Sequence, residues 1–502
     1  MHTYILHAAN VTKTFRTKRG EVHALKGVSM SLEEGSLTAM VGPDGAGKTT
    51  FIRMVTGLLA PDTGSIIVDG IHVAKEPQRV QDILSYMPQK FGLYENLTVE
   101  ENINFYADLH NVSKEEREKR FPRLLTMAGL ESFTGRLAGK LSGGMKQKLA
   151  LITALVRKPR LLLLDEPSVG VDPLSRRELW EILHELKESE KLTILVSTAY
   201  RDECEQGDMV HVFIEGEIIA SDTPNGIREV LDRRVFGTAQ EKAVIRGVSC
   251  GSLRSTDSVI SVRHLVKRFN DFTAVANTSF DVRAGEIFGL LGANGAGKTT
   301  TFRMLCGLLE ATEGELYVKG IDMRKKRREG RKYLGYVSQK FSLYDGLSVQ
   351  ENLVFFGGAY GLFGEALAQR IEEVAEEFDL KERMEEAAGD IPMGFRQRLA
   401  MSAALLHNPE ILFLDEPTSG IDPLERIAFW KEIKRLQENG KTVIVTTHFM
   451  DEAEYCDRIL IQDHGRVLAL GSPREVRGQY DLLDENMNDV FIEIIERERR
   501  GE

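Results

Sequence analysis

Residues 42–50 read GPDGAGKTT, and residues 292–300 read GANGAGKTT, 250 positions further along the 502-residue chain. The same offset relates YMPQKFGLYENLTVEEN at 86–102 and LLLLDEPSVGVDPL at 161–174 to their counterparts in the second half. Self-similarity at a fixed period indicates a repeated structural unit. The sequence therefore predicts two copies of one domain in tandem.

The limits of the repeat predict the domain organisation. We expect the first domain at 1–230, a linker at 231–257, the second domain at 258–480 and a tail helix at 481–502. The linker is mixed polar and lacks a long apolar period. The tail has apolar residues on one helical face, which favours a docking helix over a helix that binds a partner. These apolar residues are Val490, Phe491, Ile494 and Ile495.

Composition and charge limit the class of protein. With 42% hydrophobic and 28% charged residues the chain is typical of a globular protein. Its apolar runs are shorter than the roughly 18 residues of a membrane helix, and its N-terminus does not resemble a secretory signal. A formal net charge of −11 argues against broad binding to nucleic acid. The four cysteines lack metal-ligand spacing, which predicts reduced thiols in a cytosolic protein. They are Cys204, Cys250, Cys306 and Cys456.

Each repeat alternates between apolar runs and helical patterns. In the first copy, SLTAMVG, ILSYMP, RLLLLDE and LTILVST have the continuous apolar character of strands that are buried on both faces. Two later stretches, VHVFIEGEIIAS and RILIQDHGRVLALG, predict closing hairpins with Gly216 and Gly465 at the turns. The expected fold class is α/β, with a mostly parallel sheet covered by helices in each domain.

The glycine-rich stretch of each repeat matches the P-loop pattern GxxxxGK[ST] and lies between a predicted strand and a predicted helix. Backbone amides of such a loop approach phosphates, and Lys48 and Lys298 would reach the terminal phosphates. Thr49 and Thr299 would supply hydroxyl ligands for Mg²⁺. The predicted ATP-binding residues of the two loops are Gly42, Pro43, Asp44, Gly45, Ala46, Gly47, Lys48, Thr49 and Thr50, and Gly292, Ala293, Asn294, Gly295, Ala296, Gly297, Lys298, Thr299 and Thr300.

An adjacent pair of carboxylates begins 117 positions after each P-loop lysine. Asp165 and Asp415 end apolar strands, where a carboxylate is costly without a partner, so we assign both to Mg²⁺. Glu166 and Glu416 follow directly and are predicted to polarise the attacking water. The sequence thus predicts an ATP-hydrolysing site in each copy.

The segment LSGGMKQK at 141–148 completes an ordered set of P-loop, glutamine, LSGG and DEP. In this order the motifs resemble the nucleotide-binding domains of ABC ATPases, over nearly the whole chain and twice. The P-loop and glutamine stretches are similar to those of ABC-2-type exporters, and the tandem arrangement is most similar to drug-efflux ATPases of the YbhF type. The resemblance implies a RecA-like core, an antiparallel β subdomain and a helical signature-bearing subdomain in each domain.

The resemblance also implies roles for residues outside the P-loops. Phe15 and Phe269 match the aromatic residue that stacks on adenine. Gln89 and Gln339 match the loop glutamines that contact Mg²⁺ and sense the membrane subunits.

Two further matches concern communication and the γ-phosphate. Asp172 and Asp422 match the aspartate of the D-loop, which communicates across the pair of domains. His448 matches the switch histidine that holds the γ-phosphate and positions water. Its counterpart in the first copy is Ala199.

The signature of the second copy departs from the family pattern, because IPMGFRQRLA at 391–400 stands where the first copy has LSGGMKQKLA. Pro392 has neither a hydroxyl nor an N–H, and Met393 obstructs close approach. Proline starts helices well, so we expect the helix itself to survive. The intact signature can donate hydrogen bonds to a γ-phosphate at a helix start; its residues are Ser142, Gly143 and Gly144.

In the ABC family the two domains pack head to tail, so that the signature of one covers the ATP of the other. The site at Lys298 would then combine Glu416 and His448 with the intact signature. The site at Lys48 would combine Glu166 with the altered signature and lack the histidine. The prediction is that the Lys298 site carries most hydrolysis, whereas the Lys48 site binds ATP and turns over slowly.

The resemblance implies an energy-coupling ATPase for drug export that lies in the cytoplasm at the inner face of the cell membrane. Its implied partners are two multi-span permease subunits, which determine the transported molecule, and its cofactors are ATP and Mg²⁺. Two alternatives stay open: a ribosome-associated tandem ABC ATPase acting in translation, and a tandem sugar-importer ATPase. The short linker and altered signature disfavour the first, and the complete GANGAGKTT disfavours the second.

Overall fold

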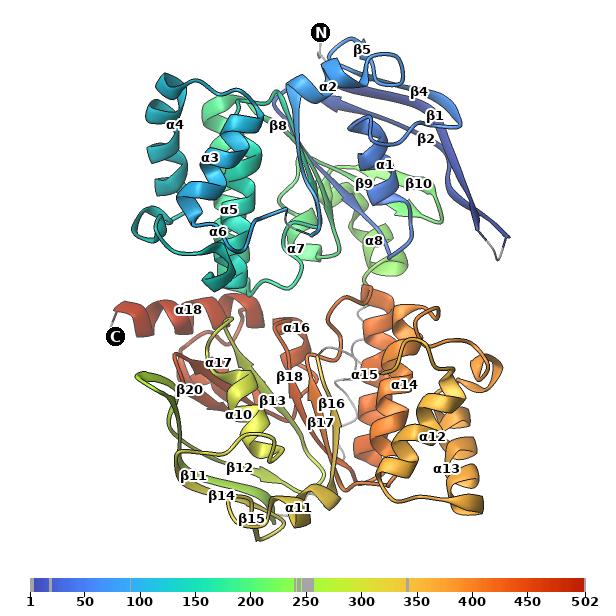
Figure 1. Ribbon diagram of the computed structural model, residues 1–502, viewed down its shortest axis with the longest axis vertical. Coiled ribbons are helices and arrows are strands. Elements are labelled where there is room, and N and C mark those ends of the chain that lie inside the picture. The colour runs from blue at the N-terminus through green and yellow to red at the C-terminus, as the bar shows by residue number, and fades with distance from the viewer. Residues whose placement is uncertain are drawn as a thin grey trace. The chain divides into compact units, whose positions relative to one another are not determined.

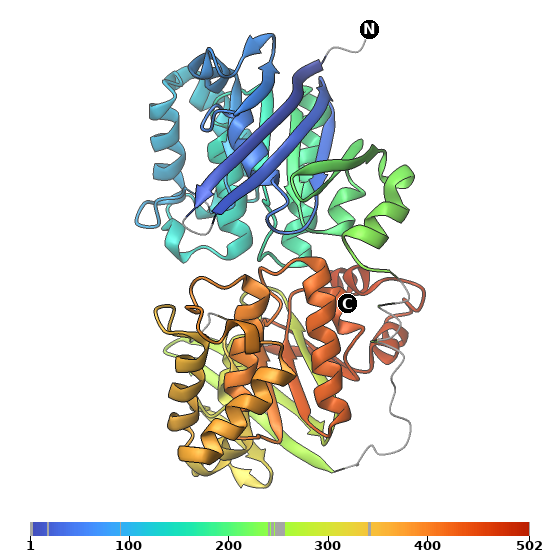
Figure 2. The ribbon, with the colours of Figure 1, turned by 90° about the vertical axis from the view of Figure 1, so that its right-hand side faces the viewer.

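The computed structural model describes residues 4–17, 20–90, 92–238, 241, 245, 257–339 and 343–500. They form two compact units, domain 1 from the first half of the chain and domain 2 from the second half (Figures 1 and 2). Cys250 and most of the predicted linker lie outside the described residues. The predicted limits of the linker therefore stay a prediction.

Domain 1 contains two sheets. Its strands are β1 (Tyr4–Thr17), β2 (Gly20–Glu33), β3 (Leu37–Val41), β4 (Thr63–Val68), β5 (Ile71–His72), β6 (Leu84–Met87), β7 (Leu161–Asp165), β8 (Thr193–Thr198), β9 (Met209–Ile214) and β10 (Glu217–Asp222). A four-stranded antiparallel sheet has the order β2-β1-β4-β5, and a six-stranded sheet has the order β10-β9-β3-β8-β7-β6. In the larger sheet only β10 is antiparallel to its neighbour, so the predicted mostly parallel sheet is confirmed.

Helices cover the larger sheet of domain 1. They are α1 (Lys48–Val55), α2 (Pro77–Ile83), α3 (Val99–Leu109), α4 (Lys114–Met127), α5 (Gly143–Leu155), α6 (Pro173–Glu190), α7 (Arg201–Cys204) and α8 (Pro224–Arg234), with short 3₁₀ turns at Glu131–Phe133 and Ala138–Lys140. Figure 1 shows α3 to α6 gathered on one side of the domain, apart from the antiparallel sheet. The helix α5 carries the intact signature at its N-terminus.

Domain 2 repeats this arrangement. Its strands are β11 (Ser258–Phe269), β12 (Phe272–Arg283), β13 (Ile287–Gly292), β14 (Glu313–Val318), β15 (Ile321–Asp322), β16 (Leu334–Val337), β17 (Ile411–Asp415), β18 (Thr442–Thr446), β19 (Arg458–Asp463) and β20 (Arg466–Gly471). The sheet orders, β12-β11-β14-β15 and β16-β17-β18-β13-β19-β20, are those of domain 1. Its helices are α10 (Lys298–Leu305), α11 (Arg327–Gly330), α12 (Val349–Ala359), α13 (Gly364–Glu377), α14 (Met393–Leu405), α15 (Pro423–Glu438), α16 (Met450–Ala453), α17 (Pro473–Gln479) and α18 (Met487–Arg500), with 3₁₀ turns at Arg331–Tyr333 and Lys381–Arg383.

The large sheet of domain 1 lies between two apolar clusters. Leu161 and Leu163 of β7 pack in the cluster that contains α1 and the antiparallel sheet. Leu162 and Leu164 pack in the cluster that contains α3, α5 and α6. Successive side chains of a strand point to opposite faces, so a strand buried on both faces must be apolar throughout. The continuous leucine run is therefore explained by burial on both sides.

The predicted closing hairpins are present in both domains. Strand β9 pairs antiparallel with β10, and β19 pairs antiparallel with β20. Gly216 and Gly465 occupy the turns with φ of 84° and 77°, a conformation that glycine adopts without steric cost.

The tail helix α18 buries the apolar face that the sequence indicates and packs against α16 in domain 2.

Three cysteines, Cys204, Cys306 and Cys456, are free and buried, and burial keeps the pKa of each thiol well above its ordinary value. Within the described ranges, the helices are too short or too polar to span a membrane.

Candidate ATP-binding and hydrolysis sites

The P-loop of each domain lies between a central strand and a helix. In domain 1 it connects β3 to α1, and Lys48 Nζ donates to the backbone oxygens of Gly42 at 2.7 Å and Pro43 at 3.1 Å. In domain 2, Lys298 Nζ makes the same contacts with the oxygens of Gly292 and Ala293. Both lysines are thus folded back over their loops, in the place where terminal phosphates would bind.

Glycine at the end of each loop is required by geometry. Gly47 precedes α1 with a φ of 101°, and a Cβ there would lie 2.5 Å from the backbone oxygen of Ala24. Gly297 has a φ of 100° and would meet the oxygen of Ala274 at 2.4 Å. Any other residue would be strained and would collide with the backbone. In domain 1 a pocket is lined by the predicted loop residues Asp44, Gly45, Ala46, Gly47, Lys48, Thr49 and Thr50 together with Gln89 and Glu166.

The predicted metal ligands of domain 1 lie together. Thr49 Oγ1 donates to Asp165 Oδ1 at 3.0 Å, and Ser197 Oγ donates to the same oxygen at 2.8 Å. Asp165 is buried at the end of β7. Hydroxyl and carboxylate oxygens are the ligands that Mg²⁺ prefers, so this donor set fits the cation.

The corresponding aspartate of domain 2 has a similar environment. Asp415 is buried, and it accepts a hydrogen bond from Thr446 Oγ1 at 2.7 Å. Burial raises the pKa of Asp415, and a bound divalent cation would oppose that shift. The other predicted ligands here are Thr299, at the start of α10, and Gln339, which follows β16.

The glutamate after each aspartate has an unusual backbone. Glu166 and Glu416 have φ values of 49° and 47°, in the left-handed region that residues other than glycine seldom adopt. In both domains the glutamine of the loop after the neighbouring strand reaches the carboxylate: Gln89 Nε2 donates to Glu166 and Gln339 Nε2 donates to Glu416, each at 2.7 Å. Backbone strain of this kind persists only where the surrounding structure enforces it. Sequence patterns alone had not indicated this strain.

The two glutamates differ in their next neighbour. His448 Nδ1 lies 3.2 Å from Glu416 Oε2, and the histidine is almost completely buried. In domain 1 the equivalent position is Ala199, and the cation nearest to Glu166 is Lys48, at 3.8 Å. The Nε2 atom of His448 is buried without a hydrogen-bond partner among the described residues. A buried polar atom without a partner calls for an explanation, and a bound polar group would supply the missing partner.

The pKa values of the two carboxyl groups are shifted in opposite directions. Burial raises the pKa of Glu166, and Lys48 only partly opposes it. Burial acts in the same direction on Glu416, but the hydrogen bond and charge of His448, together with Lys298 and Gln339, outweigh it and lower the pKa of Glu416. Glu416 consequently stays ionised, as a base requires, at lower pH than Glu166.

The two signatures start equivalent helices in their own domains. Ser142 is the N-cap of α5, and its Oγ accepts a hydrogen bond from the N–H of Met145 at 3.3 Å. Pro392 is the N-cap of α14 and makes no side-chain cap. Both helices have 13 residues, which confirms that the altered signature retains its helix. Ser142 and Gly143, and the Pro392 and Met393 that replace them, are exposed.

The glycine shared by both signatures has a packing role. A Cβ at Gly144 would lie 2.4 Å from Ser175 Oγ, and a Cβ at Gly394 would lie 2.3 Å from a carboxylate oxygen of Glu425. Each partner belongs to the helix that follows the D-loop of the same domain. Ser175 is a short side chain, so packing within the domain explains the glycine at Gly144, whereas the carboxylate end of Glu425 could move away from a Cβ at Gly394.

The remaining predicted residues also occupy compatible positions. Phe15 and Phe269 are 38% and 45% exposed, so neither is a core aromatic, and each has a lysine ammonium near its ring. Asp172 caps α6 by accepting from the N–H of Ser175 at 3.1 Å. Asp422 accepts from the N–H of Leu424 at 3.0 Å.

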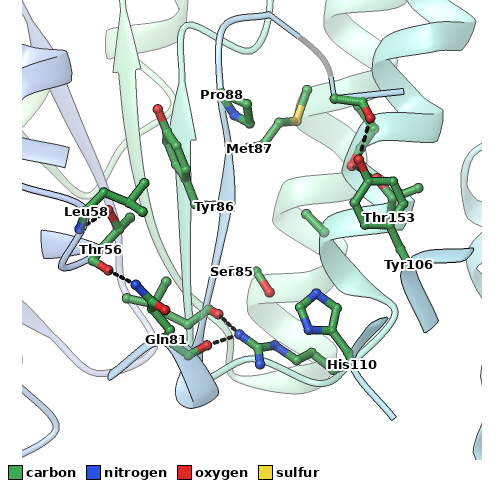
Figure 3. Close-up of a pocket in the computed structure, with 15 residues that line it drawn as sticks. Thr56, Leu58, Gln81, Ser85, Tyr86, Met87, Pro88, Tyr106, His110 and Thr153 are labelled. Atoms are coloured by element: carbon green, nitrogen blue, oxygen red, sulfur yellow. Dashed lines mark hydrogen bonds between the residues drawn. The ribbon is translucent and has the colours of Figure 1, made fainter. Parts of the chain in front are cut away.

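Domain 1 has a second pocket beside the loop of Gln89 (Figure 3). It lies between β6 and the helices α3 and α5, with Pro88 and Gly92 at the side of that loop. Arg157 closes one end by donating to the backbone oxygens of Gln81 and Leu84. The pocket therefore has a largely apolar wall and a basic end.

These observations define a tandem ATP-binding cassette. The family described as ABC transporter matches residues 25–169 and 275–419, and the chain belongs to this family. Its two cassettes bind ATP and the protein is an ATPase, because the proteins of this family hydrolyse ATP.

Particular relatives resemble the whole chain. It is 44% identical to the probable multidrug ABC transporter ATP-binding protein YbhF of Escherichia coli, over 94% of this chain and 95% of that protein. A putative ABC transporter ATP-binding protein of Methanosarcina mazei is 29% identical over 92% and 94% of the two chains. Nod factor export ATP-binding protein I of Burkholderia lata is 40% identical over 47% of this chain and 76% of its own length.

Among solved structures, the archaeal ribosome recycling factor aABCE1, in complex with ribosomal stalk protein aP1, covers 98% of both chains with a TM-score of 0.66. The sequence identity is 21%, so this likeness concerns the fold.

Proposed function

We propose that the protein powers an ABC-2-type exporter at the inner face of the cell membrane, with two multi-span permease subunits and a drug-like cargo. The full-length similarity to YbhF supports the exporter assignment, and the shorter relative is also named for export. The domain limits predicted above remain part of this proposal.

In the proposed assembly the two cassettes bind two ATP molecules head to tail. The ATP at Lys298 is covered by the intact signature, and the ATP at Lys48 faces Pro392 and Met393. Each hydrogen bond to a charged group contributes about 1.5–3 kcal/mol, so an altered signature weakens closure on the Lys48 site. The helix starting at Ser142 supplies the positive end of its dipole to the γ-phosphate.

The contact between His448 and Glu416 is the observation that supports faster ATP hydrolysis at the Lys298 site than at the Lys48 site. Glu416 accepts a proton from the attacking water, while the buried Nε2 of His448 binds the γ-phosphate and keeps the reacting groups in place. Phe269 supports the adenine ring. Bound Mg²⁺ would neutralise phosphate charge, held by Thr299, Gln339 and Asp415 in domain 2 and by Thr49, Gln89 and Asp165 in domain 1.

The pocket of Figure 3 supports a permease contact in domain 1. A permease segment seated there would press on the loop of Gln89, whose side chain holds Glu166 at 2.7 Å. Motion of the permease is thereby coupled to a catalytic carboxylate.

Purification of the tagged full-length chain from native membranes tests this assignment. We expect one or two multi-span proteins to co-purify, and Leu58→Glu in the pocket to reduce their recovery. Leu483→Glu is the control, because Leu483 is similarly exposed but lies outside the pocket. Recovery of ribosomal subunits instead of membrane proteins would overturn the exporter assignment.

A further inference from the structure

A buried carboxylate lies four residues beyond His448 and has no part in the site described above. Glu452 of α16 is completely buried. An ionised side chain is costly to bury without a partner, so its surroundings must compensate. Those surroundings are the residues next to His448.

Glu452 is connected to His448 through three neighbours, Thr447, Phe449 and Arg426, which we call the switch support. Thr447 Oγ1 donates to Glu452 Oε2 at 2.6 Å and accepts from the N–H of Phe449 at 2.9 Å. Arg426 of α15 lies 3.7 Å from Glu452 Oε1, and its guanidinium lies 3.6 Å from the centre of the Phe449 ring. That ring in turn lies 4.2 Å from the ring of His448, centre to centre.

Domain 1 contains the same support without the histidine. Thr198 Oγ1 donates to the buried Glu203 and accepts from the N–H of Tyr200 at 3.0 Å. The guanidinium of Arg176 lies 4.4 Å from the centre of the Tyr200 ring. Ala199 stands between the threonine and the tyrosine. The chain thus carries its own matched control for the function of the support.

We infer that Glu452 is a positioning residue for ATP hydrolysis, which fixes residues 447–449 so that His448 keeps its contact with Glu416. Arg426 holds the other side of the loop through Phe449 and ties it to the helix that follows Asp422. A rigid loop keeps Nε2 of His448 aimed in one direction, whereas a displacement of about 1 Å can cost roughly 100-fold in rate. The inference rests on the proposed role of His448.

Steady-state ATP hydrolysis by the purified full-length chain tests the inference. We expect Glu452→Gln and Thr447→Val to lower kcat by about tenfold or more with little change in KM for ATP. Thr447→Ser keeps the hydroxyl and should retain most activity. Glu203→Gln, the matched change in domain 1, should leave kcat within about twofold, since Ala199 has no ring to position.

A double-mutant cycle separates positioning from general damage to the fold. If Glu452 acts through His448, the variant with both Glu452→Gln and His448→Ala is no slower than His448→Ala alone. Multiplied losses, or full activity of Glu452→Gln, would overturn the inference. Should Glu452→Gln fail to fold, as melting curves would show, Thr447→Val enters the same cycle. Normal hydrolysis by His448→Ala alone would instead contradict the proposed function.

Discussion

The two domains share one scaffold and differ at a few positions of their ATP sites. The buried Leu141 has an apolar counterpart in Ile391, and Gly144 remains glycine at Gly394. The positions of Ser142 and Gly143, which become Pro392 and Met393, are exposed. The difference teaches that folding preserved the helix, whereas the groups suited to bind phosphate were free to change.

A second difference between the two domains is at a buried position next to the glutamate. His448 is buried against Glu416, whereas domain 1 has a methyl group at the same place. The carboxyl groups respond with pKa shifts in opposite directions. Two side chains therefore distinguish the surroundings of these carboxyl groups: His448 lowers the pKa of Glu416, and Asp44, whose counterpart in domain 2 is Asn294, raises the pKa of Glu166.

The largest expected effect comes from removing each carboxylate in turn. Glu416→Gln should lower kcat of the assembled complex by about 10²–10⁴-fold, the usual contribution of a general base. Glu166→Gln should lower it less than about threefold, because the proposed division of labour assigns slow turnover to that site. Equal losses in the two variants would remove the asymmetry. ATP hydrolysis at saturating ATP is the measurement.

Exchanging the signature residues between the domains tests the proposed difference in hydrolysis between the two ATP sites without changing the carboxylates. Ser142→Pro with Gly143→Met should lower hydrolysis by about tenfold or more, because at least one hydrogen bond to the γ-phosphate is lost. The reverse exchange, Pro392→Ser with Met393→Gly, should raise hydrolysis little while Ala199 remains. A large gain from the reverse exchange would show that the signature alone limits the Lys48 site.

The pH profile of ATP hydrolysis tests whether His448 lowers the pKa of Glu416. The lowered pKa of Glu416 keeps the base ionised as pH falls, so activity is lost only below that pKa. In His448→Ala the hydrogen bond and charge that oppose the effect of burial are removed, so the pKa of Glu416, and with it the acid limb of kcat/KM, should move to higher pH. An unmoved acid limb would mean that the histidine does not control this carboxyl group.

The smallest effects concern stability. Gly144→Ala places a Cβ 2.4 Å from Ser175 Oγ and should cost about 1–3 kcal/mol, lowering Tm by a few degrees. Pro392→Ser changes an exposed position and should stay within about 0.5 kcal/mol of the parent. Thermal melting of both variants provides the measurement. A destabilised Pro392→Ser would mean that this position also contributes to packing.

Much of the architecture was predictable because its causes are local or periodic. The repeat, the P-loops and the leucine strand of β7 follow from spacing and from burial on both faces. The retained helix of α14 followed from the tolerance of proline at a helix start. The limits of the linker stay a prediction, since most of it lies outside the described residues.

The sequence by itself determined the tandem α/β cassettes, the positions of their two P-loops and the absence of a histidine at Ala199. Only the tertiary structure decided the left-handed backbone at Glu166 and Glu416, the opposite pKa shifts of their carboxyl groups and the support that surrounds Glu452. The physical reason is that desolvation and charge contacts depend on distances between residues far apart in the chain. Motif spacing specifies which groups are present, and folding specifies what each of them touches.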